Sequence, residues 1–162
     1  MTDTPPLETP LAETPLVETD DRIHPGGRIV VGVDGSAESL SALRRGARMA
    51  ERLGCSLAGV TVWEYPPSWP GYVMGGWDPE RDAHTVAEDA AREVFGAKPP
   101  SWYSTVVRSG SAARQLIAEA EDAEMLIVGS RGLGGFTGLL LGSVSRSVAE
   151  HADCPVLVIH GS

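Results

Sequence analysis

The chain has 162 residues, of which 42% are apolar, and this length and composition suit one domain with a packed core. Its formal charge is −9 and no basic stripe stands out, so we expect no nucleic-acid partner. No run approaches the roughly 18 to 20 apolar residues of a membrane helix, and no basic segment followed by an apolar one opens the chain, so we expect a cytoplasmic protein without a membrane partner.

The first 26 residues differ in composition from the rest. Residues 1–24 hold six acidic residues and one arginine, and they repeat a short Leu, Glu, Thr and Pro theme. Proline interrupts helices and sheet ladders, and like charges resist collapse. We therefore expect residues 1–26 to be a disordered acidic Pro/Thr-rich tail. A solvated tail is the commoner case for such a composition, and a docking peptide is the alternative. Residues 27–162 are expected to form a single domain.

From Arg28 onward, short apolar runs alternate with amphipathic stretches. Strict alternation of strands and helices indicates an α/β fold with a parallel sheet. The strand runs are continuously apolar, as expected where helices cover both faces of a sheet. The pattern predicts strands at 29–34, 56–63, 103–108, 125–129 and 155–160, and helices at 37–53, 79–95, 111–121 and 143–152.

Residue types at the predicted helix ends agree with these boundaries. Ser36 can cap the first helix and Asp78 the second, while Gly54 and Gly96 can end them. Between the second strand and the second helix, residues 64–77 form a long loop rich in aromatic residues, Pro and Gly. Loops of this length are often lids or binding loops, so a nucleotide lid, an oligomer contact and an inert excursion all remain open.

The most informative run follows the apolar tetrad 125–128. It reads Gly129-Ser-Arg-Gly132, then nine residues, then Gly142-Ser143 at the start of a helical pattern. Glycines let the main chain approach a ligand closely and adopt positive φ, and the free N–H groups at a helix start attract anions. Because the chain is acidic, a phosphate site here must be local and made mostly of backbone.

This spacing resembles the ATP-binding signature of the universal stress protein family, Gly-x2-Gly-x9-Gly-(Ser/Thr). Gly129, Gly132, Gly142 and Ser143 match it without a gap, and the resemblance extends from about Arg28 to His160. It implies a flavodoxin-like (Rossmann-like) three-layer sandwich with a five-stranded parallel sheet ordered 3-2-1-4-5. It also implies ATP as the ligand, with Mg²⁺ or Mn²⁺ as a possible companion, and a homodimer formed through the edge strand 155–160.

In such a sheet, the ligand crevice lies outside the carboxyl ends of the strands where the winding reverses, which would place Asp34 beside the glycine loop. Asp34 either starts an Asx turn or contacts a ribose or cation, and the family's matching acid contacts the nucleotide. Arg131 either reaches phosphate or ribose or faces solvent. The hydroxyl of Ser143 can bond phosphate, cap its helix, or do both. The predicted nucleotide-binding residues are Gly32, Val33, Asp34, Val62, Val128, Gly129, Arg131, Gly132, Gly142, Ser143, Val144 and Ser145.

Other chemistries find little support in the sequence. A Walker A loop needs a lysine and a dinucleotide fingerprint needs Gly-x-Gly-x-x-Gly, and neither occurs at the expected place. The four histidines are scattered, and Cys55 and Cys154 are expected to be buried thiols. Our leading hypothesis is an ATP-binding stress sensor or regulator with slow hydrolysis at most. A nucleotide-hydrolysing or transferring enzyme and a nucleotide-free interaction module are the alternatives.

Overall fold

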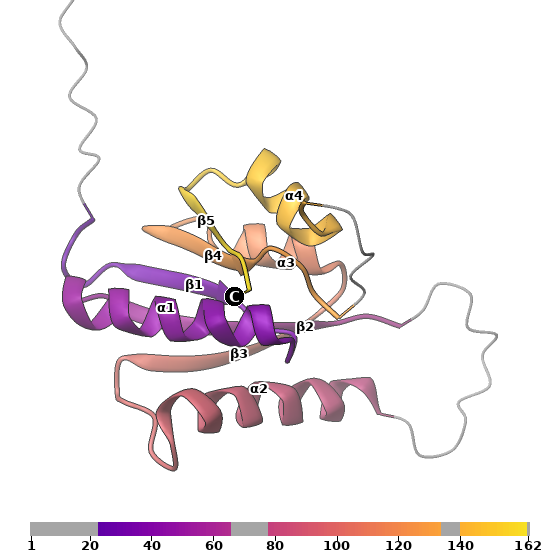
Figure 1. The fold of residues 1–162 in the computed structure, drawn as a ribbon, viewed down its shortest axis with the longest axis horizontal. Helices are drawn as coiled ribbons and strands as arrows, with labels where there is room; N and C mark the ends of the chain where they lie inside the picture. The colour runs from indigo at the N-terminus through magenta and orange to yellow at the C-terminus, as the bar shows by residue number, and fades with distance from the viewer. Residues whose placement is uncertain (1–22, 66–77, 134–139, 162) are drawn as a thin grey trace, which may run out of the picture.

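The structure is a computed structural model that describes residues 23–65, 78–133 and 140–161. Within these residues, strands and helices alternate along the chain (Figure 1). The strands are β1 (Arg28–Gly32), β2 (Ser56–Trp63), β3 (Tyr103–Ser109), β4 (Met125–Gly129) and β5 (Val156–Ile159). The helices are α1 (Ala37–Leu53), α2 (Pro79–Phe95), α3 (Ala112–Glu119) and α4 (Ser143–His151).

All neighbouring strands are parallel, and their order is β3-β2-β1-β4-β5, which confirms the expected α/β sheet. β1 lies at the centre, where Val30 is opposite Ala58 of β2 and Leu126 of β4. The chain moves outward from β1 to β3 and then returns to place β4 on the other side of β1. The carboxyl ends of β1 and β4 therefore meet where the winding direction reverses, which is the usual place for a ligand crevice.

The sheet separates two apolar layers. In Figure 1, α1 and α2 cover one face of the sheet, and α3 and α4 cover the other. Alternate residues of each strand point to opposite faces, so Val31 packs in the α1/α2 layer while Val30 packs in the α3/α4 layer. Both side chains are fully buried. This double cover explains why the central strands are continuously apolar.

Local chemistry sets the helix ends as the sequence indicates. The Ser36 hydroxyl accepts the N–H of Ser39 at 3.2 Å and caps α1, and Asp78 caps α2 by accepting the N–H of Arg81 at 3.1 Å. Gly54 ends α1 with φ +68°, a left-handed conformation that favours glycine.

Some predicted boundaries were wrong by one or two residues. β1 ends at Gly32 rather than at residue 34, α3 spans 112–119 rather than 111–121, and β5 spans 156–159 rather than 155–160. Residues at element ends make few ladder or helix hydrogen bonds, and their assignment varies accordingly. The tail up to residue 22 and most of the aromatic loop, 66–77, lie outside the described residues. Among the described residues, no helix has the length and apolarity needed to cross a membrane.

Candidate functional site

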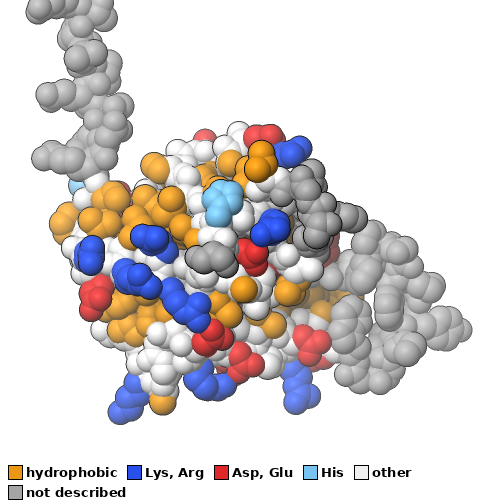
Figure 2. Space-filling model, in the orientation of Figure 1, with side chains coloured by type: hydrophobic (Ala, Val, Ile, Leu, Met, Phe, Trp, Pro, Cys, Tyr) orange, Lys and Arg blue, Asp and Glu red, His pale blue; other side chains and the backbone are white. Residues whose placement is uncertain are grey.

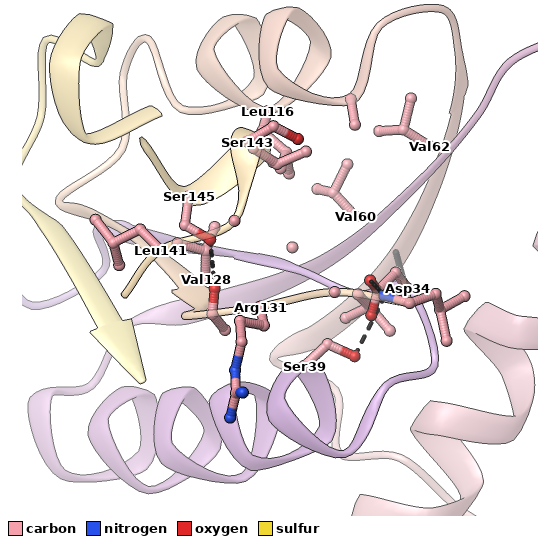
Figure 3. Close-up of a pocket in the computed structure, with 18 residues that line it drawn as sticks. Asp34, Ser39, Val60, Val62, Leu116, Val128, Arg131, Leu141, Ser143 and Ser145 are labelled. Carbon is pink, nitrogen blue, oxygen red and sulfur yellow. Dashed lines mark hydrogen bonds between the residues drawn. The ribbon is translucent and has the colours of Figure 1, made fainter. Parts of the chain in front are cut away.

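A cavity of about 400 Å³ opens at the carboxyl ends of β1 and β4 (Figure 3). Its volume lies within the usual range of small-molecule sites, which is roughly 300–1,000 Å³. The structure brings all twelve predicted residues to the walls of this cavity. They are Gly32, Val33, Asp34, Val62, Val128, Gly129, Arg131, Gly132, Gly142, Ser143, Val144 and Ser145.

Asp34 occupies the connection between β1 and α1 and uses both carboxylate oxygens. Its Oδ1 accepts the N–H of Ser36 at 3.0 Å, which forms the Asx turn that the sequence suggests. Its Oδ2 accepts the N–H of Leu133 at 3.1 Å. The side chain therefore joins the start of α1 to the glycine loop that follows β4. The predicted sheet order places Asp34 beside this loop, but it does not predict the hydrogen bond to Leu133.

The glycines of the loop are used for close packing rather than for left-handed backbone. Glycine permits both, but Gly129, Gly132 and Gly142 do not adopt positive φ. A Cβ on Gly129 would lie 2.8 Å from the Cβ of Glu38, and a Cβ on Gly132 would lie 2.4 Å from Oδ2 of Asp34. These two glycines are needed because other parts of the protein pack directly against them.

Gly142 has a different environment. The atoms nearest to a Cβ built there are at 3.5 Å or more, which is ordinary contact. Gly142 is the N-cap residue of α4, and no side chain caps this helix. The N–H groups of Ser143, Val144 and Ser145 consequently lack acceptors within the helix, and these residues line the cavity. The partial positive charge of a helix N-terminus is thus directed at the cavity.

Serine hydroxyls at the start of α4 divide into two roles. Ser145 is buried, and its Oγ lies 2.7 Å from the carbonyl oxygen of Gly129 and 3.1 Å from that of Ser130, which holds α4 against the end of β4. Ser143 is exposed. It is the first residue of α4 rather than its cap, so the capping alternative for its hydroxyl was wrong.

Arg131 lies in the glycine loop, and its guanidinium pairs with Glu38 of α1 at 3.5 Å. In Figure 3 this side chain points toward α1, away from Val60 and Val62. The exposed fraction of the Arg131 side chain is 44%, which agrees with the alternative that it faces solvent. The ion pair with Glu38 was not predicted from the sequence. Arg131 borders the cavity but does not direct its charge into it in this conformation.

The opposite wall of the cavity is apolar. Val60 and Val62 of β2, Val128 of β4 and Leu116 of α3 line it, and they belong to one apolar cluster. Leu116 was missed because a leucine at a helical repeat reads as ordinary core, and nothing in a single sequence separates the two roles. The cavity residues that sequence reasoning missed are Ser39, Val60, Ala112, Leu116, Leu133 and Leu141.

Among the described residues, no titratable group with a shifted pKa lines the cavity. Burial would raise the pKa of Glu119, but hydrogen bonds from Arg28 and Arg108 outweigh burial and lower it. Burial raises the pKa of both cysteine thiols, and Cys55 is buried as expected while Cys154 is half-buried. The residues described by the structure contain no group of three or more His, Cys, Asp or Glu that could hold a metal ion.

Comparison with known proteins decides the family. The model of the universal stress protein family matches residues 27–160. The chain belongs to this family. A curated relative, universal stress protein Rv2005c of Mycobacterium tuberculosis, is 34% identical over 144 residues, which cover 82% of this chain and 47% of the relative. The chain thus spans about half the length of the curated relatives it matches.

Solved structures of the family share this fold. A crystal structure of a universal stress protein in complex with cAMP is 27% identical, covers 85% of this chain and 98% of that chain, and has a TM-score of 0.63. Universal stress protein UspA from Lactobacillus plantarum superimposes with a TM-score of 0.64 at 21% identity, covering 85% of this chain and 99% of that chain. The five-stranded parallel sheet with four helices is the fold that these universal stress proteins share.

Proposed function

We propose that this universal stress protein binds an adenine nucleotide, ATP in the first place, in the cavity between β1 and β4. The observation that carries the proposal is the pairing of an apolar wall with an uncapped helix N-terminus across one cavity. An adenine ring needs apolar surface, and phosphates need N–H donors. The cAMP complex of a family member with 27% identity supports the same ligand class.

In this arrangement each wall has its own task. The base lies against Val60, Val62 and Leu116, and main chain at Gly32 and Val128 borders the base and ribose. The phosphates lie at the glycine loop and accept hydrogen bonds from the N–H groups that open α4. These amides are already fixed by the fold, so they bind phosphate with little loss of conformational freedom.

The oxygens of ATP and of Asp34 are the groups that would coordinate a metal ion in this cavity. If Mg²⁺ or Mn²⁺ accompanies ATP, the phosphate oxygens supply most ligands, as Mg²⁺ commonly binds through substrate phosphates and one or two carboxylates. Asp34 is the single carboxylate among the described residues that line the cavity. Its two oxygens already accept the N–H groups of Ser36 and Leu133, so it has only remaining lone pairs to offer.

We further propose that the bound nucleotide regulates rather than fuels chemistry, with hydrolysis that is slow at most. The described cavity residues include Asp34, already hydrogen-bonded, and Arg131, paired with Glu38. Neither group is placed to activate a water molecule. A cytoplasmic location stays a prediction from the sequence.

β5 supports a proposed homodimer. It pairs with β4 along one edge, and its four apolar side chains are all half-buried. An open edge of this kind can pair with a second copy of the chain. Light scattering at micromolar concentration should give twice the chain mass, and a monomer would contradict the proposal.

Calorimetric titration with ATP, AMP and cAMP tests the ligand. Gly142→Val places methyl groups near the amides of α4, and the Cβ that carries them has room, because its nearest neighbours lie at 3.5 Å or more. We expect it to weaken binding at least about tenfold, equivalent to about 1.4 kcal/mol. Ala149→Val is the matched control, because Ala149 is an exposed residue of the same helix away from the cavity. Binding that is absent in the natural chain, or unchanged in Gly142→Val, would overturn the proposal.

Single-turnover measurement separates the regulator from an enzyme. Product formation faster than about a few per minute, on the usual scale of catalytic rates, would favour a nucleotide-using enzyme. An enzyme would also lose this rate when Asp34 is replaced. Asp34→Asn is the better replacement than Asp34→Ala, because it retains an acceptor for the Leu133 N–H. Absence of nucleotide both in titration and in mass spectrometry of the denatured protein would favour the nucleotide-free interaction module.

A further inference from the structure

A short row of arginines runs along the outer face of α1. Arg45, Arg48 and Arg52 are spaced by three and four residues, which places them on one side of a helix. All three are exposed. Figure 2 shows the corresponding line of basic side chains over α1. We call these three residues the α1 arginine row. These arginines are separated in the sequence, and the helix brings them to one side.

The α1 arginine row lacks partners within the described part of the chain. Neighbouring Arg44 pairs with Glu93 of α2, so its charge is already balanced. Glu38, in the first turn of α1, pairs with Arg131. No hydrogen bond or ion pair joins the row to any described residue, including Glu51 on its flank. The row therefore concentrates positive charge on a protein whose net charge is −9.

The acidic tail enters the domain beside the same end of α1. Ile23 packs on the apolar layer beneath α1, and the N–H of Gly26 donates to the carbonyl oxygen of Gly54 at 2.8 Å. Gly54 caps the carboxyl end of α1, two residues after Arg52. The chain before Ile23 thus begins close to the Arg52 end of the row.

The tail and the α1 arginine row are compatible in length and opposite in charge. The row spans about 10 Å, given 1.5 Å per helical residue. Three acidic residues, Glu18, Asp20 and Asp21, lie within five residues of Ile23, together with one basic residue, Arg22, so this stretch has a net charge of −2 (three acids less one base). Five extended residues reach about 17 Å, which exceeds the length of the row. Farther along, Asp3, Glu8 and Glu13 add charge of the same sign.

We propose that the N-terminal tail, residues 1–22, docks on the α1 arginine row of its own chain. Its carboxylates neutralise the row, and the short tether gives them a high effective concentration there. Because the charges are solvent-exposed, the contact is individually weak and sensitive to salt. A docked tail competes with any other polyanion for the row. This inference concerns a face of the protein other than the nucleotide cavity.

Arginine side-chain NMR signals of the full chain test the contact directly. The variant E18Q/D20N/D21N, which we call the tail-neutralised variant, removes three carboxylates and leaves the length of the tail unchanged. We expect the Nε–H signals of the row to move in this variant, while that of Arg81, an exposed arginine of α2, stays in place. In about 1 M NaCl, where the Debye length is about 3 Å, the natural chain and the variant should coincide.

A competition measurement adds a second readout. A short single-stranded RNA should bind the tail-neutralised variant about three- to tenfold more tightly than the natural chain, the effect of freeing a few exposed cations. Adding R45Q/R48Q/R52Q to the variant should remove this gain. The natural chain supplies the salt-dependence measurement even if a multiple variant fails to fold.

Three results would overturn the proposal. Row signals that are identical in the natural chain and the tail-neutralised variant would show that the tail does not touch α1. Differences that vanish on tenfold dilution would assign the contact to the tail of a second copy. Equal RNA affinity of the natural chain and the tail-neutralised variant would show that the row is open to polyanions.

Discussion

Oδ2 of Asp34 accepts the N–H of Leu133 at 3.1 Å, and this hydrogen bond connects two segments that are 99 residues apart in sequence. It closes the site from the side of β1. The same oxygen lies 2.4 Å from the position that a Cβ on Gly132 would take. The carboxylate therefore occupies the space that a side chain at position 132 would need, so the two positions act as one unit.

A double-mutant cycle tests this unit. Asp34→Ala should lower the free energy of unfolding by about 1–3 kcal/mol, because it removes hydrogen bonds to a charged acceptor. Gly132→Ala should cost about 1–3 kcal/mol through overpacking against that acceptor. The double variant should cost clearly less than the sum, since the clash disappears with the carboxylate. Urea unfolding measures all four proteins, and strict additivity would contradict the predicted coupling.

Gly129 and Gly142 should differ in what their substitution changes. Gly129→Ala should lower the free energy of unfolding by about 1–3 kcal/mol, because its methyl group would meet the Cβ of Glu38 at 2.8 Å and backbone atoms of α1. Gly142→Ala has room and should cost less, about 0.5–1 kcal/mol, which is the weaker N-cap preference of alanine. Thermal or urea unfolding distinguishes them, and an equal loss of stability in both variants would contradict the packing argument.

This difference also changes how the site should be probed. A variant carrying bulky residues at both Gly129 and Gly142 would confuse unfolding with loss of ligand binding. Substitution at Gly142 alone tests the role of the α4 amides in ligand binding separately from folding, because there is room for a Cβ at this position.

The sheet order illustrates what a single sequence can provide. The alternation of strands and helices followed from the residues, while the order β3-β2-β1-β4-β5 came from the family resemblance and is confirmed. The twelve predicted residues do line one cavity, because a glycine signature and the carboxyl end of β1 are local features. Their contact with a nucleotide stays a prediction.

Long-range side-chain partners were not predictable in this way. The Glu38–Arg131 pair and the contact between Asp34 and Leu133 join segments separated by more than 90 residues. Nothing in the spacing of these residues indicates that they are partners. Likewise, the reason for Gly129 lies in the Cβ of Glu38 on another element, so the sequence suggested backbone freedom where the structure requires space.

The Glu38–Arg131 pair makes a prediction about phosphate affinity. A guanidinium held at 3.5 Å from a carboxylate is partly neutralised before a ligand arrives. Glu38→Gln should free Arg131 and tighten ATP binding about two- to fivefold, within the range of exposed ion pairs. Arg131→Gln should weaken ATP more than AMP, which carries fewer charges. Calorimetry at low and high salt checks both, and equal effects on the two nucleotides would argue against a phosphate role.

Glu119 makes the final prediction, which concerns stability against acid. It accepts hydrogen bonds from Arg28 at 2.9 Å and Arg108 at 2.6 Å, and only 13% of its side chain is exposed. Burial alone would raise its pKa, but the two arginines outweigh burial and hold the pKa below the ordinary value of 4.5. A carboxyl group whose pKa is lowered by folding stabilises the fold above its unfolded pKa. That contribution is lost as the pH falls through the lowered value.

Glu119→Gln should therefore lower the free energy of unfolding at pH 7 by about 1–3 kcal/mol, the usual worth of hydrogen bonds to a charged group. The difference from the natural chain should shrink as the pH falls from above 4.5 through the lowered pKa. Glu121→Gln is the matched control, because Glu121 is exposed and two residues away. Urea unfolding at a series of pH values measures the difference. A deficit that stays constant with pH would show that Glu119 stabilises the fold by packing rather than by its charge.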